Sequence, residues 1–418
     1  MPSSVDALVS HVGALRAGLV VVPANTAYSE SELAHIVRDV RAECAIVDRE
    51  DQADWVRRAA PEALVTGPEL ALPDGDPGAV DSAGPDDPAL ICFTSGTTGA
   101  PKGAVLRHRQ LLAATGSVTR AWRMSPDDRL VHALPVFHAH GLVVGAYGTL
   151  SSGGSAVLLP GFDPGAVAAA VRADRATLFF GVPTMYHRLV TSGRASDLAG
   201  LRLCVSGSAP LPSELHAEAS AAIGSVVLER YGMTETLMNT SNPYAGERRA
   251  GTVGFPLPGV EVAFDDAGQV LLRGPNVFDG YFERDSANAE AFRDLDDGGG
   301  PWFVTGDLAE DVDGYLMIRG RSKELIISGG FNVYPTEVED VLSGCPGVAE
   351  VAVTGTPSDE WGEEVTAWVV ADGAAPTVEG LRAHCTGRLA PYKQPRRIRV
   401  VDALPRNALG KVVRSLLG

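Results

Sequence analysis

Short apolar runs that pass directly into small polar turns recur through the first half of the chain, and helical periodicity follows each turn. Four of these runs are Ala89 to Phe93, Thr177 to Phe180, Leu201 to Val205 and Val226 to Leu228. Such runs, bounded by turn residues, predict buried strands, and the repeated order of strand, loop and helix is typical of an α/β domain. Ligands of open α/β sheets bind at the carboxyl ends of the strands, so we expect the four loops to line one crevice.

The pattern changes beyond Gly254, where short alternating segments are separated by Gly and Asp. This pattern predicts a small β-rich subdomain. The stretch Gly320-Arg-Ser-Lys323 indicates a junction, and after it we expect a helix, two strands and a second helix, over residues 335–342, 348–354, 364–370 and near 378–389. We therefore predict an α/β protein that has a large N-terminal domain of packed α/β sheets with a β-rich subdomain, and a small mobile α+β C-terminal lid domain. The predicted bounds are residues 1–320 and 321–418.

Composition narrows the class of protein. The 418 residues are 45% hydrophobic, which is enough for a large core and a smaller second domain. Thirty-five basic residues against 52 acidic ones give a net charge of -17, which repels nucleic acid. The five cysteines are odd in number and widely spaced, so we expect neither a disulfide framework nor a zinc site, and a cytoplasmic location. No targeting segment or membrane span is visible.

A phosphate-binding loop is indicated by Thr94-Ser-Gly-Thr-Thr-Gly-Ala-Pro-Lys-Gly103. Its ten residues include four hydroxyls, three glycines and one lysine. Glycines allow the backbone N–H groups to approach an anion closely, and the lysine adds positive charge. A Walker loop ends in Gly-Lys-Ser/Thr, whereas Pro101-Lys102-Gly103 stands here, so a P-loop nucleotidase is disfavoured.

The same string, with Phe93 in place of a tyrosine, resembles the hallmark of the adenylate-forming superfamily, which includes acyl-CoA synthetases, nonribosomal peptide adenylation domains and beetle luciferases. Further motifs of that family follow in the family's order, and they are Gly207-Ser-Ala-Pro210, Tyr231-Gly-Met-Thr-Glu235, Thr305-Gly-Asp307, Gly320-Arg-Ser-Lys323 and Pro405-Arg-Asn-Ala-Leu-Gly-Lys411. The resemblance implies a fold, two half-reactions and three ligands, namely ATP, Mg²⁺ and coenzyme A.

The resemblance also implies roles in binding ATP. It assigns phosphate binding to Thr94, Ser95, Gly96, Thr97, Thr98, Gly99 and Lys102. The loop Gly207, Ser208, Ala209 and Pro210 would lie along the adenine, and Tyr231, followed by Gly232, would stack on it. Thr234 would bind the α-phosphate, and Glu235 would hold Mg²⁺ together with Thr98. Asp307 would accept hydrogen bonds from the ribose, assisted by Arg321.

Two further positions carry the chemistry of the two half-reactions in the family. Lys411 matches the lysine that bridges the substrate carboxylate and the α-phosphate, where an ammonium offsets the repulsion between two anions. Lys323 matches the hinge about which the small domain swings into a thioester-forming pose. In that pose the face that carries Gly329 and Gly330 would replace Lys411, and the glycines would let the arm of coenzyme A pass close to the backbone.

Substrate choice is indicated by three strings that are similar to malonyl-CoA and methylmalonyl-CoA synthetases. They are Leu134-Pro-Val-Phe-His-Ala-His-Gly141, Gly181-Val-Pro-Thr-Met-Tyr-His-Arg188, and Glu229 to Pro243. The resemblance implies that Arg188, Arg230 and Ser208 grip the far carboxylate, with His138 beside the reacting carboxyl and Met233 in the acyl pocket. The planar guanidinium of an arginine can bind a carboxylate through two hydrogen bonds at once. Alternatively, either arginine is an ordinary ion-pair partner of Glu229 or another acid.

Family members usually begin several dozen residues upstream of the segment that Val5 to Ala24 resembles. We therefore expect the first part of the large domain to be absent and neighbouring strands to expose an apolar edge. Three alternatives to a malonyl-CoA synthetase stay open: a medium-chain or aryl acyl-CoA synthetase, a truncated remnant without catalysis, and an acyl-AMP ligase that feeds a carrier protein. The oligomeric state and the pathway do not follow from the sequence.

Overall fold

A seven-stranded sheet lies at the centre of the protein in a computed structural model that describes residues 1–70, 78, 80–94, 101–373, 376–407 and 411–417. In spatial order its strands are β11 (Phe255–Pro256), β10 (Thr240–Ser241), β9 (Leu228–Tyr231), β8 (Leu203–Ser206), β7 (Leu178–Gly181), β5 (Arg129–His132) and β6 (Ser155–Leu158). The five strands from β9 to β6 are parallel, whereas β10 and β11 are antiparallel. A parallel sheet needs helical crossovers, which explains the alternation of strand and helix along the sequence.

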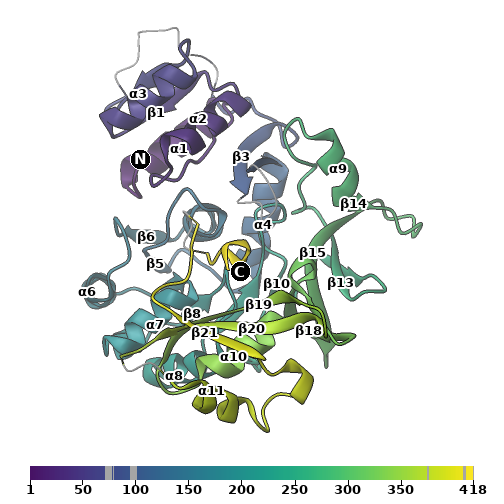
Figure 1. Cartoon of the computed structure of the whole chain (residues 1–418). Helices are drawn as coiled ribbons and strands as arrows, with labels where there is room; N and C mark the ends of the chain where they lie inside the picture. Colours follow the sequence, from purple (N-terminus) through teal and green to yellow (C-terminus); the bar gives the residue numbers. More distant parts are fainter. Residues whose placement is uncertain (71–77, 79, 95–100, 374–375, 408–410, 418) are drawn as a thin grey trace.

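Helices cover this sheet, and the core lies between the two layers (Figure 1). They are α4 (His108–Ala121), the π-helix η1 (His140–Tyr147), α5 (Gly148–Ser151), α6 (Pro164–Asp174), α7 (Pro183–Thr191), η2 (Ala195–Leu198) and α8 (Ser213–Ile223). Strands β7 and β8 are buried along their whole length, as parallel strands covered on both faces must be. Trp122 packs edge-on against Phe180, and its indole N–H donates to Ser241 at 2.9 Å.

The first predicted strand does not join this sheet. β3 (Pro88–Thr94) instead pairs with β4 (Lys102–Arg107) in an antiparallel hairpin. The prediction of a strand at residues 89–93 is therefore confirmed, but its neighbour is the strand on the other side of the phosphate loop. A backbone bridge from Val21 to Leu90 ties the hairpin to the N-terminal segment.

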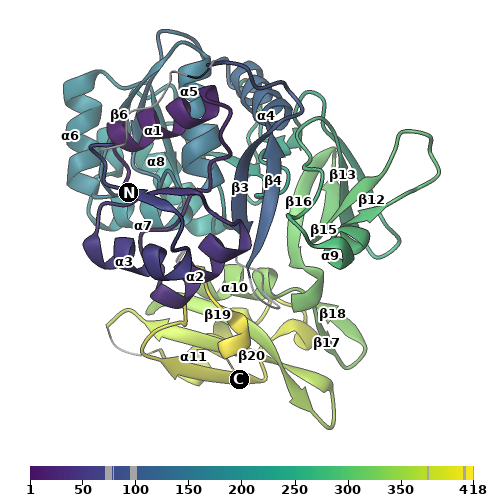
Figure 2. The ribbon, with the colours of Figure 1, turned by 90° about the horizontal axis from the view of Figure 1, so that it is seen from above.

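The N-terminal segment forms a small unit of helices and short strands beside the hairpin (Figure 2). It contains α1 (Val5–Arg16), α2 (Glu30–Asp39), β1 (Cys44–Ile46), α3 (Glu50–Ala59) and β2 (Leu64–Thr66). A capping box between Ser29 and Glu32 fixes the start of α2. Apolar side chains are exposed on α1 and just after it, with exposed fractions of 64% at Val5, 60% at Val9 and 56% at Leu19.

The predicted β-rich part follows the central sheet and forms one five-stranded sheet. Its strands are β12 (Glu261–Phe264), β13 (Gln269–Arg273), β14 (Phe292–Arg293), β15 (Trp302–Val312) and β16 (Tyr315–Arg321), with α9 (Asp285–Ala291) packed beside them. The long pair β15 and β16 places Asp307 directly opposite Arg321. Two predicted site residues from separate motifs therefore meet through strand register.

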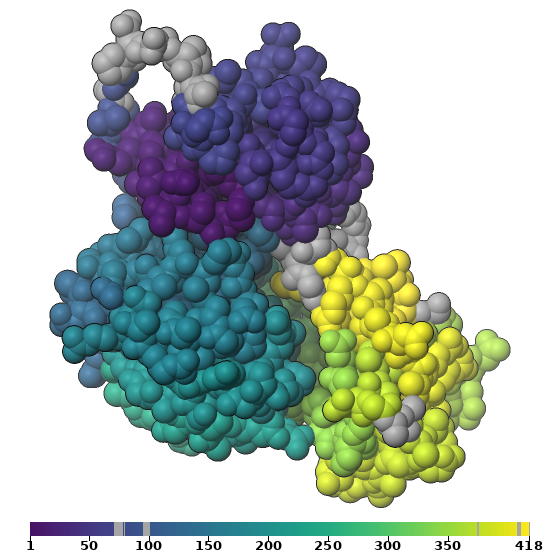
Figure 3. Space-filling view, turned by 90° about the vertical axis from the view of Figure 1, so that its left-hand side faces the viewer, coloured from purple at the N-terminus to yellow at the C-terminus, as the bar shows by residue number. Residues whose placement is uncertain are grey.

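The C-terminal part is a second α+β unit, as predicted. Its elements are η3 (Ser322–Glu324), β17 (Ile326–Ser328), β18 (Phe331–Val333), α10 (Pro335–Ser343), β19 (Val348–Ser358), β20 (Gly362–Ala371), α11 (Val378–Cys385), η4 (Pro391–Lys393), β21 (Arg397–Val401) and η5 (Arg414–Leu416). Asp340 on α10 accepts hydrogen bonds from the Ser213 backbone N–H at 2.9 Å and hydroxyl at 3.1 Å, and so holds this unit against α8. Figure 3 shows a hollow between the two parts. Within the ranges given above, no helix is long and apolar enough to cross a membrane.

One buried charge pair anchors the edge of the central sheet. The Asp128 side chain, on a residue 2% exposed, accepts a two-pronged contact from Arg202 at 2.6 Å and hydrogen bonds from Thr177 and Ser125. Burial alone would raise the pKa of Asp128, but the Arg202 and Thr177 contacts outweigh it and lower that pKa. The carboxylate thus stays charged and ties three segments together.

Replacing Asp128 with Ala should lower the free energy of unfolding by about 3 kcal/mol, because Arg202 is left without its partner. Urea unfolding measures this change. The matched control is Glu310→Ala, which breaks the Arg319 pair on a side chain that is 50% exposed and should cost less than about 1 kcal/mol. Equal losses in the two variants would contradict the anchoring role.

Candidate active site

Three of the four predicted loops meet at the carboxyl edge of the central sheet. Strands β7, β8 and β9 are parallel neighbours, so the segments after Gly181, Ser206 and Tyr231 leave the sheet on the same side. Each of these strands ends in residues too small or too polar to continue a buried run, which is why the chain turns there. The expected crevice is therefore built mainly by the loops after β7, β8 and β9.

Tyr231, Asp307 and Arg321 form one polar group beside that edge. The Tyr231 hydroxyl donates to one Asp307 carboxylate oxygen, and the Arg321 Nε lies 2.8 Å from the other. Arg321 also donates to the Thr305 carbonyl at 3.2 Å. Burial raises the pKa of Asp307, and Arg321 opposes that rise. Asp307 is thus a buried acceptor, oriented from two sides, as the ribose assignment requires.

Glu235 is held from the other side by a tyrosine that the sequence motifs did not include. The Tyr281 hydroxyl donates to Glu235 Oε1 at 2.9 Å, and the Lys102 ammonium lies 5.2 Å from the centre of the Tyr281 ring. Burial raises the pKa of Glu235, and the Tyr281 hydrogen bond and the charge of Arg321 oppose that rise. A backbone bridge between Tyr281 and Ala104 joins this group to β4. Tyr281 follows β13 in the chain, and nothing in the sequence around it indicated a contact with Glu235.

Part of the predicted phosphate loop lies outside the described residues, namely Ser95, Gly96, Thr97, Thr98 and Gly99. The two ends of the loop are described, and the Thr94 hydroxyl donates to the Lys102 carbonyl at 3.4 Å. In the part of the chain that the structure covers, no three His, Cys, Asp or Glu side chains are grouped to hold a metal ion.

Arg230 is a buried cation without an anion. The residue is 5% exposed, and its Nε and Nη2 are buried without a hydrogen-bond partner among the described residues. Burial lowers the pKa of this guanidinium to about 9. Gly207 is required beside it, because a Cβ there would lie 2.4 Å from the Arg230 Nε. The absence of a side chain at Gly207 therefore leaves space for the Arg230 guanidinium.

Glu229 does not neutralise Arg230, although it precedes it in the chain. Consecutive strand residues point to opposite faces of a sheet. The Glu229 carboxylate accepts from the Gly251 N–H at 3.0 Å and lies 3.9 Å from His216 on its own face. The alternative that pairs Arg230 with Glu229 is therefore not what the structure shows.

Two histidines border Arg230. Burial, followed by the charges of Lys411 and Arg230, lowers the pKa of His138 to about 4, so the ring is neutral near pH 7. His140 Nδ1 lies 3.1 Å from the Ser208 hydroxyl, and the His140 backbone N–H donates to His138 Nδ1 at 3.3 Å. His140 belongs to the same sequence string as His138, but its contact with Ser208 arises only in the fold.

Arg188 lies apart from this buried group. It is exposed on α7, and its guanidinium stacks over the Phe162 ring at 5.0 Å from the ring centre. Arg188 therefore differs from Arg230, which is buried and has two guanidinium nitrogens without a hydrogen-bond partner among the described residues. Phe162 is partly buried, and the cation–π contact of an exposed arginine with it is weak enough for a ligand to displace.

The remaining predicted residues of the loops after β8 and β9 differ in burial and in the space around them. Gly232 is required sterically, because a Cβ there would lie 2.0 Å from the Leu237 carbonyl oxygen. Thr234 and Met233 are half-buried beside Glu235, and Met233 Sδ lies 3.8 Å from the Tyr231 hydroxyl. Ala209 and Pro210 are exposed on the loop that follows β8.

Lys411 reaches the same site from the end of the chain. Burial lowers the pKa of its ammonium, Arg321 lowers it further, and Glu235 and Asp307 raise it. The residue as a whole is exposed, while its ammonium interacts with the charges of Arg321, Glu235 and Asp307. Lys323, Gly329 and Gly330 are exposed, the first in η3 and the other two at the turn between β17 and β18.

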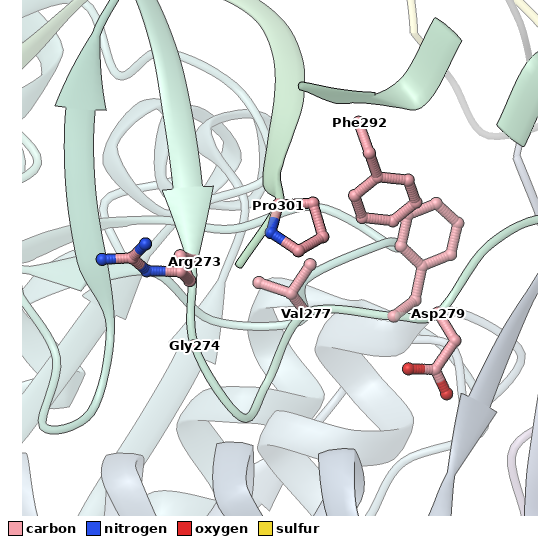
Figure 4. Close-up of a pocket in the computed structure, with 7 residues that line it drawn as sticks. Arg273, Gly274, Val277, Asp279, Phe292 and Pro301 are labelled. Carbon is pink, nitrogen blue, oxygen red and sulfur yellow. The ribbon is translucent and has the colours of Figure 1, made fainter. Parts of the chain in front are cut away.

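A separate cavity of about 350 Å³ lies behind the Glu235 loop (Figure 4). Its walls include Val277, Phe278, Phe292 and Pro301. The Phe278 N–H donates to the Glu235 carbonyl at 2.8 Å, so the cavity adjoins the loop from the rear. None of its lining residues is a predicted site residue.

Known proteins are similar to this chain along nearly its whole length. The family model of the AMP-binding enzyme matches residues 1–282, and that of the AMP-binding enzyme C-terminal domain matches residues 337–411. Feruloyl-CoA synthase of an Amycolatopsis species is 38% identical over 96% of this chain and 83% of its own length. Malonate–CoA ligase of Arabidopsis thaliana is 34% identical over 96% and 74%. The crystal structure of ATP-bound MatB from Rhodopseudomonas palustris is 42% identical, with a TM-score of 0.91 over 100% of this chain and 86% of its own.

The buried Glu229 predicts a dependence of stability on pH. Burial raises its pKa from 4.5 to about 8. Between these values the folded chain holds a proton that the unfolded chain releases, so the free energy of unfolding falls as the pH rises. Glu229→Gln, which is neutral throughout, should therefore gain stability relative to the wild type between about pH 5 and pH 8. Urea unfolding across that range measures the gain.

The exposed residue Glu218 on α8 supplies the control. Glu218→Gln should unfold in parallel with the wild type over the same pH range. A Glu229→Gln curve that also stays parallel would contradict the raised pKa.

Proposed function

The chain belongs to the AMP-binding enzyme family and is an ATP-dependent, AMP-forming acyl-CoA synthetase, and we propose that its acid is a small dicarboxylate, with malonate the leading candidate. The resemblance that the motifs indicated is thereby confirmed at the level of the family. The substrate and the roles of individual residues below are proposals.

The unpaired guanidinium of Arg230 is the observation that carries the substrate proposal. A fatty or aromatic acid has one carboxylate, which must reach the α-phosphate, and its tail would leave Arg230 buried and unpaired. An uncompensated buried charge costs about 3–5 kcal/mol. A second carboxylate would instead form a charge-assisted, two-pronged contact with the guanidinium. Ser208 would bind the same carboxylate, and Arg188 would do so after it is displaced from the Phe162 ring.

The first half-reaction joins the acid to AMP. A carboxylate oxygen attacks the α-phosphate of ATP, the bond to the β-phosphate bridging oxygen breaks, and pyrophosphate leaves. The Lys411 ammonium would offset the repulsion between the two anions where they meet, and Thr234 would hold the α-phosphate. Asp307, oriented by Tyr231 and Arg321, would accept the ribose hydroxyls, while Lys102 would face the outer phosphates.

Glu235 fits a divalent cation, because it is a buried carboxyl with a raised pKa and no cation bonded to it. We propose that Glu235, together with Thr98, holds Mg²⁺. When bound, Mg²⁺ neutralises part of the charge of the triphosphate.

The second half-reaction transfers the acyl group to coenzyme A. The thiol sulfur attacks the carbonyl carbon of the adenylate, the thiol proton is released, and AMP leaves. We propose that the part beyond residue 320 rotates at Lys323 and brings the Gly329–Gly330 turn to the substrate in place of Lys411.

An aryl acyl-CoA synthetase is the second candidate, and the 38% identity to feruloyl-CoA synthase favours it. The two candidates differ in the fate of Arg230, which an aromatic acid would leave unpaired. Substrate preference therefore separates them.

The proposed function is tested by pyrophosphate release from ATP with Mg²⁺ and coenzyme A. Malonate, methylmalonate, acetate, octanoate and ferulate are compared side by side. We expect kcat/KM to be far higher for the two dicarboxylates than for acetate, octanoate and ferulate, which should turn over only slowly. A preference for acetate, octanoate or ferulate would refute the dicarboxylate assignment.

Arg230→Gln should lower kcat/KM for malonate by about 10²–10³-fold, since it removes the partner of the far carboxylate. Steady-state kinetics with malonate and octanoate measure the change, and octanoate turnover should not fall. The matched control is Arg172→Gln, which removes an arginine whose side chain is 56% exposed on α6 and should leave kcat/KM unchanged. A loss of malonate activity in Arg188→Gln as well would show that Arg188 also binds the far carboxylate. Equal losses of malonate and octanoate activity in Arg230→Gln would contradict the proposal.

A further inference from the structure

Lys411 is held on a short hairpin near the end of the chain. The Asn407 N–H donates to the Lys411 carbonyl at 2.9 Å, and the Lys411 N–H donates to Asn407 Oδ1 at 3.0 Å. The Val413 N–H donates to the Pro405 carbonyl at 2.8 Å. The backbone of Lys411 is therefore fixed within this hairpin, and its place in the active site depends on what anchors the hairpin.

Apolar packing supplies one anchor. Val412 and Leu417 pack against Trp368 and Leu404, which are 6% and 5% exposed. Apolar burial is non-directional, so this contact fixes how deeply the hairpin sits but does little to fix its orientation. A flexible lysine stem would then leave the ammonium free to sweep over several positions.

Arg414, which follows the hairpin directly, supplies a directional anchor. Its Nη1 donates to Glu324 at 2.9 Å, and its Nη2 donates to both carboxylate oxygens of Glu339 at 2.8 and 2.9 Å. The three side chains are only 16–24% exposed. Glu339 also accepts from the Val353 N–H at 2.7 Å, which fixes the carboxylate in place. One guanidinium thus joins the chain end to η3, to α10 and, through Glu339, to β19.

The arginine at this junction stays charged. Burial would lower the pKa of Arg414, but Glu339 and Glu324 outweigh it and raise that pKa. The planar fork of an arginine can address two carboxylates in fixed directions at once, which a lysine cannot do. Glu324 follows the hinge candidate Lys323 directly, so the fork ties the hairpin to the element at which the small domain would turn.

We propose that Arg414 is a positioning residue that orients the Lys411 hairpin for the first half-reaction. This inference rests on the proposed function, in which Lys411 acts in adenylation and the Gly329–Gly330 face acts in thioester formation. An arginine that served the stability of the small domain in general would support both half-reactions. An arginine that positions Lys411 supports the first half-reaction selectively.

The two half-reactions can be measured separately on the full chain. Exchange of labelled pyrophosphate into ATP with malonate reports adenylation. Release of coenzyme A from malonyl-CoA on addition of AMP reports the second half-reaction in reverse, in which the thioester is broken and the adenylate re-formed. Arg414→Met should reduce the exchange by about 10²-fold, as small misplacements of catalytic groups do, and leave AMP-dependent release within about twofold of the wild type.

Two further variants guard against a folding defect in Arg414→Met. Arg414→Lys keeps the charge without the fork and should give an intermediate, still selective loss. Glu324→Gln keeps the Glu339 pair, so the small domain retains its buried contact while the link to η3 is broken. It should reduce the exchange by about tenfold without a change in release. The control is Arg397→Gln, which breaks the 2.6 Å pair with Glu364 in the same unit and should change neither reaction.

The outcomes distinguish the inference from the function on which it rests. A selective loss of exchange in all three hairpin-anchor variants supports the inference. Equal losses in both half-reactions, or no loss in either, overturn it while the wild type remains active. A wild type that performs neither half-reaction with malonate overturns the malonate proposal, and with it the inference that rests on it.

Discussion

A cation buried without an anion is the constraint on which this site depends. Arg230 is enclosed by the loops after β8 and β9, Gly207 leaves it room, and Glu229 faces away from it. Proteins rarely bury an arginine unpaired, because the cost of removing it from water is not recovered. The arrangement becomes favourable once a ligand supplies the missing negative charge, and in the proposed function this requirement selects the acid.

Other charged groups in the crevice are also buried. Burial raises the pKa values of Asp307 and Glu235 and lowers those of Arg230 and Lys411, so carboxylates and cations alike lack part of their charge compensation. The two carboxylates are nevertheless held by neighbours, Asp307 by Tyr231 and Glu235 by Tyr281. Groups that are oriented in advance and poorly solvated interact most strongly with charge that develops during a reaction. The free site is thus electrostatically incomplete in a way that ATP and a dianion would complete.

Most of the fold followed from the sequence, because strand and helix periodicity is local. The strands at residues 178–181 and 203–206 and the elements of the C-terminal unit lie close to their predicted positions. The strand at residues 88–94 was predicted, but not its pairing with β4, which depends on a turn through the phosphate loop. Pairing is a long-range property that periodicity does not encode.

The site was predicted less completely, and for the same reason. Motif order placed Asp307, Arg321 and Lys411 in one site, whereas Tyr281 and His140 were missed because their contacts join distant segments or depend on a loop conformation. Arg188 shows the converse, since its motif position matched but its side chain lies over Phe162. Sequence motifs identify which loops meet, and side-chain packing decides which members of each loop face the ligand.

The central claim is that Arg230 receives the far carboxylate of the acid. A crystal structure of the protein with malonate and a non-hydrolysable ATP analogue tests it most directly. The account predicts one malonate carboxylate within hydrogen-bonding distance of the Arg230 guanidinium and the other facing the α-phosphate beside Lys411. A malonate bound elsewhere in the crevice, with Arg230 still unpaired, would contradict it.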